Sequence, residues 1–150
     1  MTVKELTYRV RAHDPEEQNH VKRVLEDLRK EHPEVSVKIE SESKKLVPQE
    51  VVLSIGITVA SEILAVATLS FLDKLWKRLE KHEKDFILSS LDSAQRKAEK
   101  YLLDMGISDI ELSEREDKGL YALFVFRSKK ASYRLHISKA DLQIIKFKKG

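Results

Sequence analysis

The sequence predicts an α+β fold, in which strands and helices occupy largely separate stretches of the chain. Apolar and polar residues alternate with period two near the N-terminus, and a series of strand-like runs ends the chain. Between them lies an apolar stretch long enough for a buried helix. We therefore expect a single domain over residues 1–150. Its parts are an N-terminal β-α-β unit (1–41), a long apolar helix (48–81), a second helix (90–105) and a C-terminal antiparallel β-meander (107–148).

The first part, residues 1–41, has the pattern of a β-α-β unit. Residues 5–12 alternate strictly, which is typical of a half-buried strand. Asp14 and Pro15 then suit the N-cap and first turn of a helix, whose apolar positions follow a helical spacing. Residues 35–40 alternate again. A crossover of this kind makes its two strands parallel if they belong to one sheet.

The stretch VVLSIGITVASEILAVATLSFL, residues 51–72, is open to more than one interpretation. We expect it to belong to one long helix, because Pro48 favours a first helical turn and the run is apolar nearly all round. Small residues recur along it at steps of three and four, which predicts a seam for helix packing or oligomerisation. This seam consists of Ser54, Thr58, Ser61, Ala65 and Thr68.

A membrane span is the alternative for the same stretch. Residues 51–72 are about as long as a bilayer requires, and Trp76 with neighbouring bases follows them like an interfacial anchor. Glu62 opposes this interpretation, because an unpaired carboxylate near the midplane costs roughly 2.5–3.5 kcal/mol on insertion scales. A cytoplasmic protein with a buried or subunit-interface helix fits better, and the absence of cysteine agrees with a reducing compartment.

The second half of the chain predicts one helix and a meander. Ser90 and Asp92 suit a helix start, and Gly106 suits the end of that helix. The strand-like runs that follow are separated by turn residues, which predicts antiparallel hairpins. Residues 120–126 are apolar on both faces and are therefore expected to form a central strand.

Charge is unevenly distributed along the chain. The net charge is +3, yet residues 118–150 hold nine basic residues against one acid, Asp141, so the remainder is acidic. The two parts could attract each other, within the fold or between subunits. Alternatively, basic and aromatic residues on exposed strands bind nucleic acid. The candidate nucleic-acid contacts are Arg127, Lys129, Lys130 and Arg134.

The sequence shows no combination of residues typical of an enzyme. It lacks a glycine-rich phosphate loop, and its five histidines lack the spacing of a metal site. Asp109, Glu111 and Lys129 resemble part of a metal-dependent nuclease site, but Arg127 stands where a metal-binding acid is needed. We therefore predict no catalytic residue, cofactor, metal or small-molecule substrate.

Residues 1–84 contain, in order, a strand, a helix rich in Leu and Arg (VKRVLEDLRKEHPEV) and a second strand. The step Pro48-Gln49-Glu50 then leads into a small-residue apolar helix that ends in LDKLWKRLEK. This organisation resembles the effector-associated constant component proteins of prokaryotic conflict systems. The resemblance implies a small accessory module and assigns no functional residues.

Taken together, these observations predict a non-enzymatic interaction or accessory module. We expect it to form homo-oligomers through the apolar helix, or to bind a protein partner. Nucleic-acid binding through the basic strands and membrane association through residues 51–72 are the alternatives. Abundant Glu and Lys with a single Asn, Asn19, resemble the composition of thermophile proteins.

Overall fold

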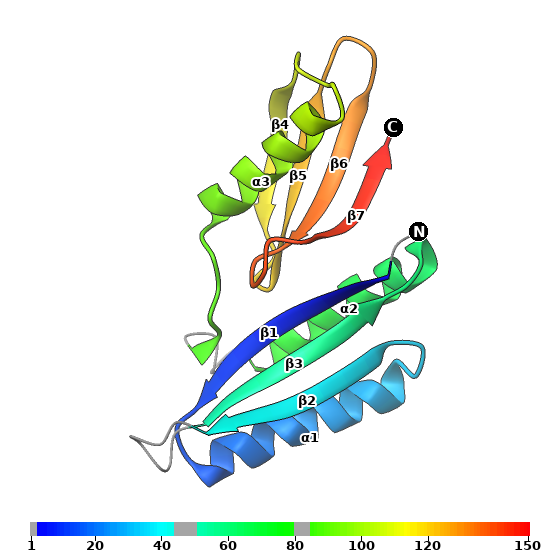
Figure 1. The fold of residues 1–150 in the computed structure, drawn as a ribbon. Coiled ribbons are helices and arrows are strands. Elements are labelled where there is room, and N and C mark those ends of the chain that lie inside the picture. Colours follow the sequence, from blue (N-terminus) through cyan, green and yellow to red (C-terminus); the bar gives the residue numbers. More distant parts are fainter. Residues whose placement is uncertain (1–2, 44–50, 80–84) are drawn as a thin grey trace. The chain divides into compact units, whose positions relative to one another are not determined.

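The structure, a computed structural model, describes residues 3–43, 51–79 and 85–150 (Figure 1). The chain divides into two compact units, Met1–Ile87 (unit 1) and Leu88–Gly150 (unit 2), and the single domain expected from the sequence stays a prediction. Each unit has its own sheet and at least one helix to cover it, which is the minimum needed for a separate core. Helices and strands are both abundant, so the predicted α+β class is confirmed.

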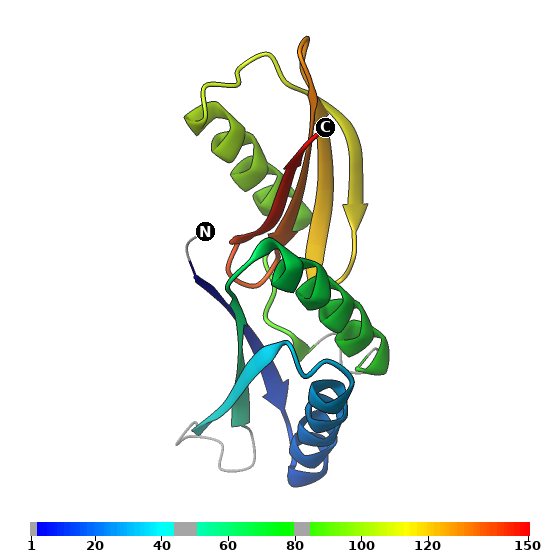
Figure 2. The ribbon, with the colours of Figure 1, turned by 90° about the vertical axis from the view of Figure 1, so that its right-hand side faces the viewer.

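Unit 1 contains a three-stranded antiparallel sheet with two helices on one side of it (Figure 2). Its elements are β1 (Lys4–Ala12), α1 (Pro15–Glu31), β2 (Ser36–Ser43), β3 (Val51–Val59) and α2 (Glu62–Arg78). The strand order is β1-β3-β2, and both outer strands run antiparallel to β3. β1 and β2 are therefore parallel to each other, as the β-α-β pattern predicts, with β3 inserted between them.

The apolar stretch is not one helix, so the predicted helix over residues 48–81 is wrong in its first half. β3 occupies the part from Val51 to Val59, and α2 begins only at Glu62. The reason is the alternation of apolar and small or polar residues along β3 from Leu53 to Val59. Its core-facing side chains are fully buried, namely Leu53, Ile55, Ile57 and Val59. The residues between them, Ser54, Gly56 and Thr58, lie on the opposite face of the sheet.

Ser61 separates β3 from α2. Its Oγ accepts a hydrogen bond from the backbone N–H of Leu64 (3.2 Å), which caps the helix. Glu62 is exposed in the first turn, where its carboxylate suits the positive end of the helix dipole. None of the helices in the described part of the chain is long and apolar enough to cross a bilayer. The expected helix ends at residues 48–50 and 80–81 fall outside the described residues.

Unit 1 ends in a short segment that pairs with β1. Phe86 forms an isolated antiparallel bridge to Val10, and the N–H of Ile87 donates to the carbonyl oxygen of Arg9 (2.9 Å). The ring of Trp76, on α2, lies 6.0 Å from that of Phe86. Among the described residues, the element order therefore resembles a β-α-β-β-α-β motif in which this isolated bridge stands in the last strand position.

Unit 2 contains one helix and a four-stranded antiparallel sheet. Its elements are α3 (Leu91–Asp104), β4 (Glu111–Asp117), β5 (Tyr121–Arg127), β6 (Ser132–Ser138) and β7 (Ile144–Lys149). The strand order β4-β5-β6-β7 confirms the predicted meander, and α3 confirms the predicted second helix.

The core of unit 2 lies between α3 and one face of the sheet. Ala94, Ala98 and Leu102 on α3 are fully buried in one cluster with Phe124 on β5 and Leu135 on β6. The two alanines carry little side chain, so the helix backbone approaches the large side chains of the sheet closely. β4 lies beyond this core, and all seven of its residues are exposed.

Candidate interaction surface: the sheet edges of unit 2

The two edge strands of the unit 2 sheet carry opposite charge. β4 has four acidic residues and one basic residue, Arg115, whereas β7 has three lysines and no acid. The acids are Glu111, Glu114, Glu116 and Asp117, and the lysines are Lys146, Lys148 and Lys149. Among the described residues, each edge strand pairs with one neighbour only, β4 with β5 and β7 with β6.

The strand register arranges these charges in rows on the sheet face opposite α3. Phe124 and Leu135 face α3, so residues one position along the same strands face away from it. The first row consists of Glu114, Val125, Arg134 and Lys148. The second row consists of Glu116, Leu123, His136 and Lys146. Each row therefore begins at an acid on β4 and ends at a lysine on β7.

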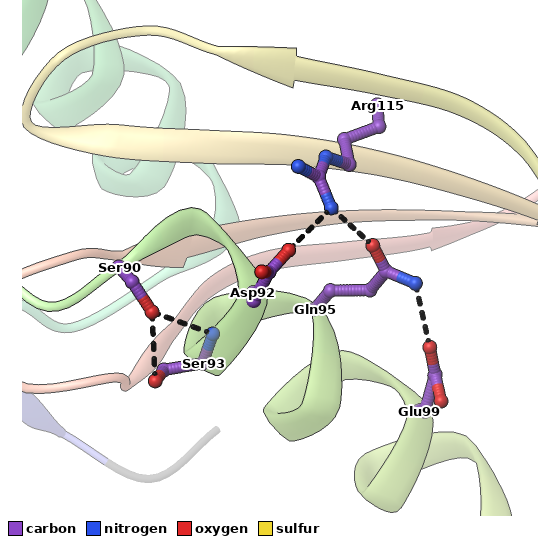
Figure 3. A network of polar contacts seen from close by, with 6 residues as sticks. All are labelled: Ser90, Asp92, Ser93, Gln95, Glu99 and Arg115. Atoms are coloured by element: carbon purple, nitrogen blue, oxygen red, sulfur yellow. Dashed lines mark hydrogen bonds and ion pairs between the residues drawn. The ribbon is translucent and has the colours of Figure 1, made fainter.

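On its other face, β4 is held to α3 by polar contacts (Figure 3). Nη1 of Arg115 donates to Oδ1 of Asp92 and to Oε1 of Gln95, both at 2.8 Å, and Nε2 of Gln95 donates to Glu99. Arg115, Asp92 and Gln95 line part of an open cavity of about 370 Å³. The Asp92 side chain is 76% exposed, so its ion pair with Arg115 holds β4 only weakly.

His136 lies in the second row without a charge of its own at neutral pH. Burial, helped by the cations Lys146, Arg134 and Lys118, lowers the pKa of His136 from 6.5 to about 4. Its Nδ1 atom is buried and has no hydrogen-bond partner among the described residues. The charge of this row therefore resides at its two ends, on Lys146 and on Glu116, which also forms an ion pair with Lys118 (2.9 Å).

The four residues predicted to contact nucleic acid do not form one basic patch. Arg127 and Arg134 lie on the face opposite α3, but Arg127 pairs across the ladder with Glu111. Lys129 and Lys130 lie in the turn between β5 and β6. The backbone N–H of Lys129 donates to a carboxylate oxygen of Asp109 (3.1 Å), so an acid adjoins this turn as well.

The predicted small-residue seam of unit 1 does not lie along one helix. Ser54 and Thr58 belong to β3, and Ser61 is the cap of α2. Ala65 and Thr68 do lie on α2, but both are buried and unavailable to a second copy. The exposed apolar residues of this helix are instead Ile63 and Val66.

Sequence reasoning did not identify the edge strands as a surface, because the predicted meander gives the strand order but not the register that aligns their charges. The available signal was the change from acidic residues in 111–117 to basic residues in 144–149. No protein-family model, curated protein or solved structure matches this chain. The resemblance of residues 1–84 to conflict-system accessory proteins therefore stays a prediction. The fold and the surface define an α+β protein of two units, with an oppositely charged pair of sheet edges in unit 2.

Proposed function

We propose that this protein is a non-enzymatic interaction module that self-associates head to tail through the sheet edges of unit 2. β4 of one copy pairs with β7 of the next. The observation that carries the proposal is the arrangement of charge in rows. Glu114 and Lys148 end one row, and Glu116 and Lys146 end the other.

Strand direction favours the same pairing. Neighbouring strands of the meander are antiparallel, so β4 and β7, three positions apart, also run in opposite directions. A copy placed beside the first therefore continues the antiparallel sheet. In the register that extends the rows, Lys148 of the second copy lies beside Glu114, and Lys146 lies beside Glu116. Opposite-charge cross-strand pairs contribute roughly 0.2–1 kcal/mol each, in addition to the new backbone hydrogen bonds.

Charge reversal tests this pairing. The acid-reversed variant carries Glu114→Lys and Glu116→Lys, and the base-reversed variant carries Lys146→Glu and Lys148→Glu. Each variant alone should lose self-association, because its two edges now have the same sign. An equimolar mixture of the two variants should associate again, because the basic edges of one variant can pair with the acidic edges of the other. The measurement is absolute mass by size-exclusion chromatography with light scattering, over a range of protein concentrations.

A third variant separates edge pairing from general attraction between unlike proteins. Lys129→Glu with Lys130→Glu makes the same change of net charge as the base-reversed variant, but in a turn away from both edges. This control should self-associate as the wild type does. Its equimolar mixture with the acid-reversed variant should have a lower average mass than the equimolar mixture of the acid-reversed and base-reversed variants. A monomeric wild type at every concentration, or equal masses in the two mixtures, would refute the proposal.

Single-stranded nucleic acid is the second candidate partner. Arg134, Lys146 and Lys148 lie on neighbouring strands of one sheet face, which is a suitable arrangement for phosphate contacts. The same variants distinguish this function, with fluorescence anisotropy of a labelled oligonucleotide at several salt concentrations as the readout. Binding that the base-reversed variant loses and the acid-reversed variant keeps, in a monomeric wild type, would favour nucleic acid over self-association.

A further inference from the structure

A separate group of metal-ligating side chains lies at the start of α1 in unit 1. His13 follows β1, Glu17 lies in the first turn of α1, and Asp85 precedes Phe86. One ligand atom of each side chain lies within 4.8 Å of the other two, and Nε2 of His13 is 2.8 Å from Oδ1 of Asp85. We propose that these three residues bind a divalent transition-metal ion such as Zn²⁺.

The backbone holds the three side chains in this arrangement. The backbone N–H of Glu17 donates to Oδ1 of Asp14 (2.8 Å), which fixes the first turn of the helix. The backbone N–H of His13 donates to Oε2 of Glu17 (2.9 Å), which holds the carboxylate beside His13, and a carboxylate oxygen of Glu17 lies within 4.8 Å of an imidazole nitrogen. Asp85 is positioned by the bridge between Phe86 and Val10 that follows it. The ligands are thus placed before a metal arrives, and little of the binding energy is lost in ordering them.

The donor atoms indicate the class of metal. One imidazole nitrogen and two carboxylate oxygens suit Zn²⁺ and its neighbours among the first-row metals, whereas Mg²⁺ and Ca²⁺ favour sites made of oxygen only. The side chain of His13 is 51% exposed and that of Asp85 18%, so water can reach the ion and complete its coordination. Glu16, also in the first turn of α1, adds negative charge near the site.

Metal binding has a structural consequence for unit 1. His13 and Asp85 are 72 positions apart in the sequence, and in the described part of the chain the residues after Asp85 pair with β1 at the bridge between Phe86 and Val10. An ion shared by His13, Glu17 and Asp85 would tie this segment to the turn between β1 and α1. It would therefore fix the point at which the chain leaves unit 1.

An ion pair between His13 and Asp85, together with the hydrogen bond from the backbone N–H of His13 to Glu17, would hold all three groups without any metal. The decisive residue is Glu17, because its side chain takes no part in the ion pair but is needed as a metal ligand. Glu16→Gln is a matched control for Glu17→Gln, because it removes the same charge from the same turn, at a residue outside the group. The four other histidines of the chain are present in all of these proteins and report any unspecific binding.

The test is isothermal titration of metal-free full-length protein with ZnCl₂, and with MgCl₂ for comparison. We expect one Zn²⁺ per chain and much weaker binding of Mg²⁺. His13→Ala and Glu17→Gln should each weaken Zn²⁺ binding by about tenfold or more, and Glu16→Gln should leave it unchanged. The melting temperature should rise with Zn²⁺ in the wild type and in Glu16→Gln only. Absence of saturable binding, or equal affinity in the Glu16 and Glu17 variants, would overturn the assignment.

Discussion

Replacing Ser61 with alanine should destabilise unit 1. The sign of the change in stability tests whether residues 51–78 form a strand followed by a helix or one continuous helix. The Oγ of Ser61 accepts a hydrogen bond from the N–H of Leu64 at 3.2 Å, the long end of the normal range. Losing an N-cap costs about 0.5–2 kcal/mol, so we expect a loss of about 0.5–1 kcal/mol here. In one continuous helix the same change would instead stabilise by about 0.5 kcal/mol, because alanine is the better helix former.

The assay is thermal unfolding followed by the fluorescence of Trp76, the only tryptophan of the chain, which lies on α2. For a unit of this size, the loss should lower the melting temperature by about 2–8 °C. Ser70→Ala makes the same chemical change within α2 and is expected to keep or raise the melting temperature. If the melting temperature of Ser61→Ala rose as much as that of Ser70→Ala, a strand followed by a capped helix would be refuted.

Two further predictions concern unit 2. Phe124 is fully buried, so Phe124→Ala should cost about 3–5 kcal/mol and expose the amides of the sheet to hydrogen exchange, whereas Phe147→Ala, at a partly buried site, should cost less. Burial lowers the pKa of His136 to about 4, so the unfolded chain takes up a proton first as the pH falls. The free energy of unfolding should therefore be highest above about pH 6.5 and should decline toward pH 4. Measured as denaturant midpoints, the stability of His136→Gln should depend less on pH in this range than that of the wild type. An equal pH dependence in both proteins would contradict this role of His136.

The strand β3 shows why part of the fold could not be read from the sequence. Ser54 and Thr58 are four residues apart, and a spacing of four belongs both to one face of a helix and to one face of a strand. The length of the apolar run favoured the helix. Gly56 and the β-branched residues beside it favour the strand, because glycine costs about 1 kcal/mol in a helix interior. β5 was predictable, since its run is short, apolar on both faces and bounded by turn residues.

The candidate surfaces are formed by residues far apart in the sequence, so no local sequence pattern predicts them. The basic residues of the C-terminal part were visible, but their alignment with the acids of β4 required the register of the strands. The shared row of Glu114 and Lys148 also depends on an irregularity after Leu112, which shifts the register between β4 and β5. Likewise, the spacing of the histidines gave no sign of the proposed metal site, because Asp85, which contacts His13, is 72 positions away.

Two copies could meet at their sheet edges in three ways: β4 with β4, β7 with β7, or β4 with β7. The charges on these strands favour the last. Charged, exposed edge strands usually prevent sheets from joining, and two copies of β4 would indeed place acids against acids. Two copies of β7 would place lysines against lysines. Only β4 against β7 brings unlike charges together, so the same residues oppose both symmetric contacts and favour the head-to-tail one. A head-to-tail contact forms a ring if its rotation closes and a filament if it does not. One mass that stays constant as the protein concentration rises would indicate a closed ring, whereas a range of masses that grows with concentration would indicate an open filament.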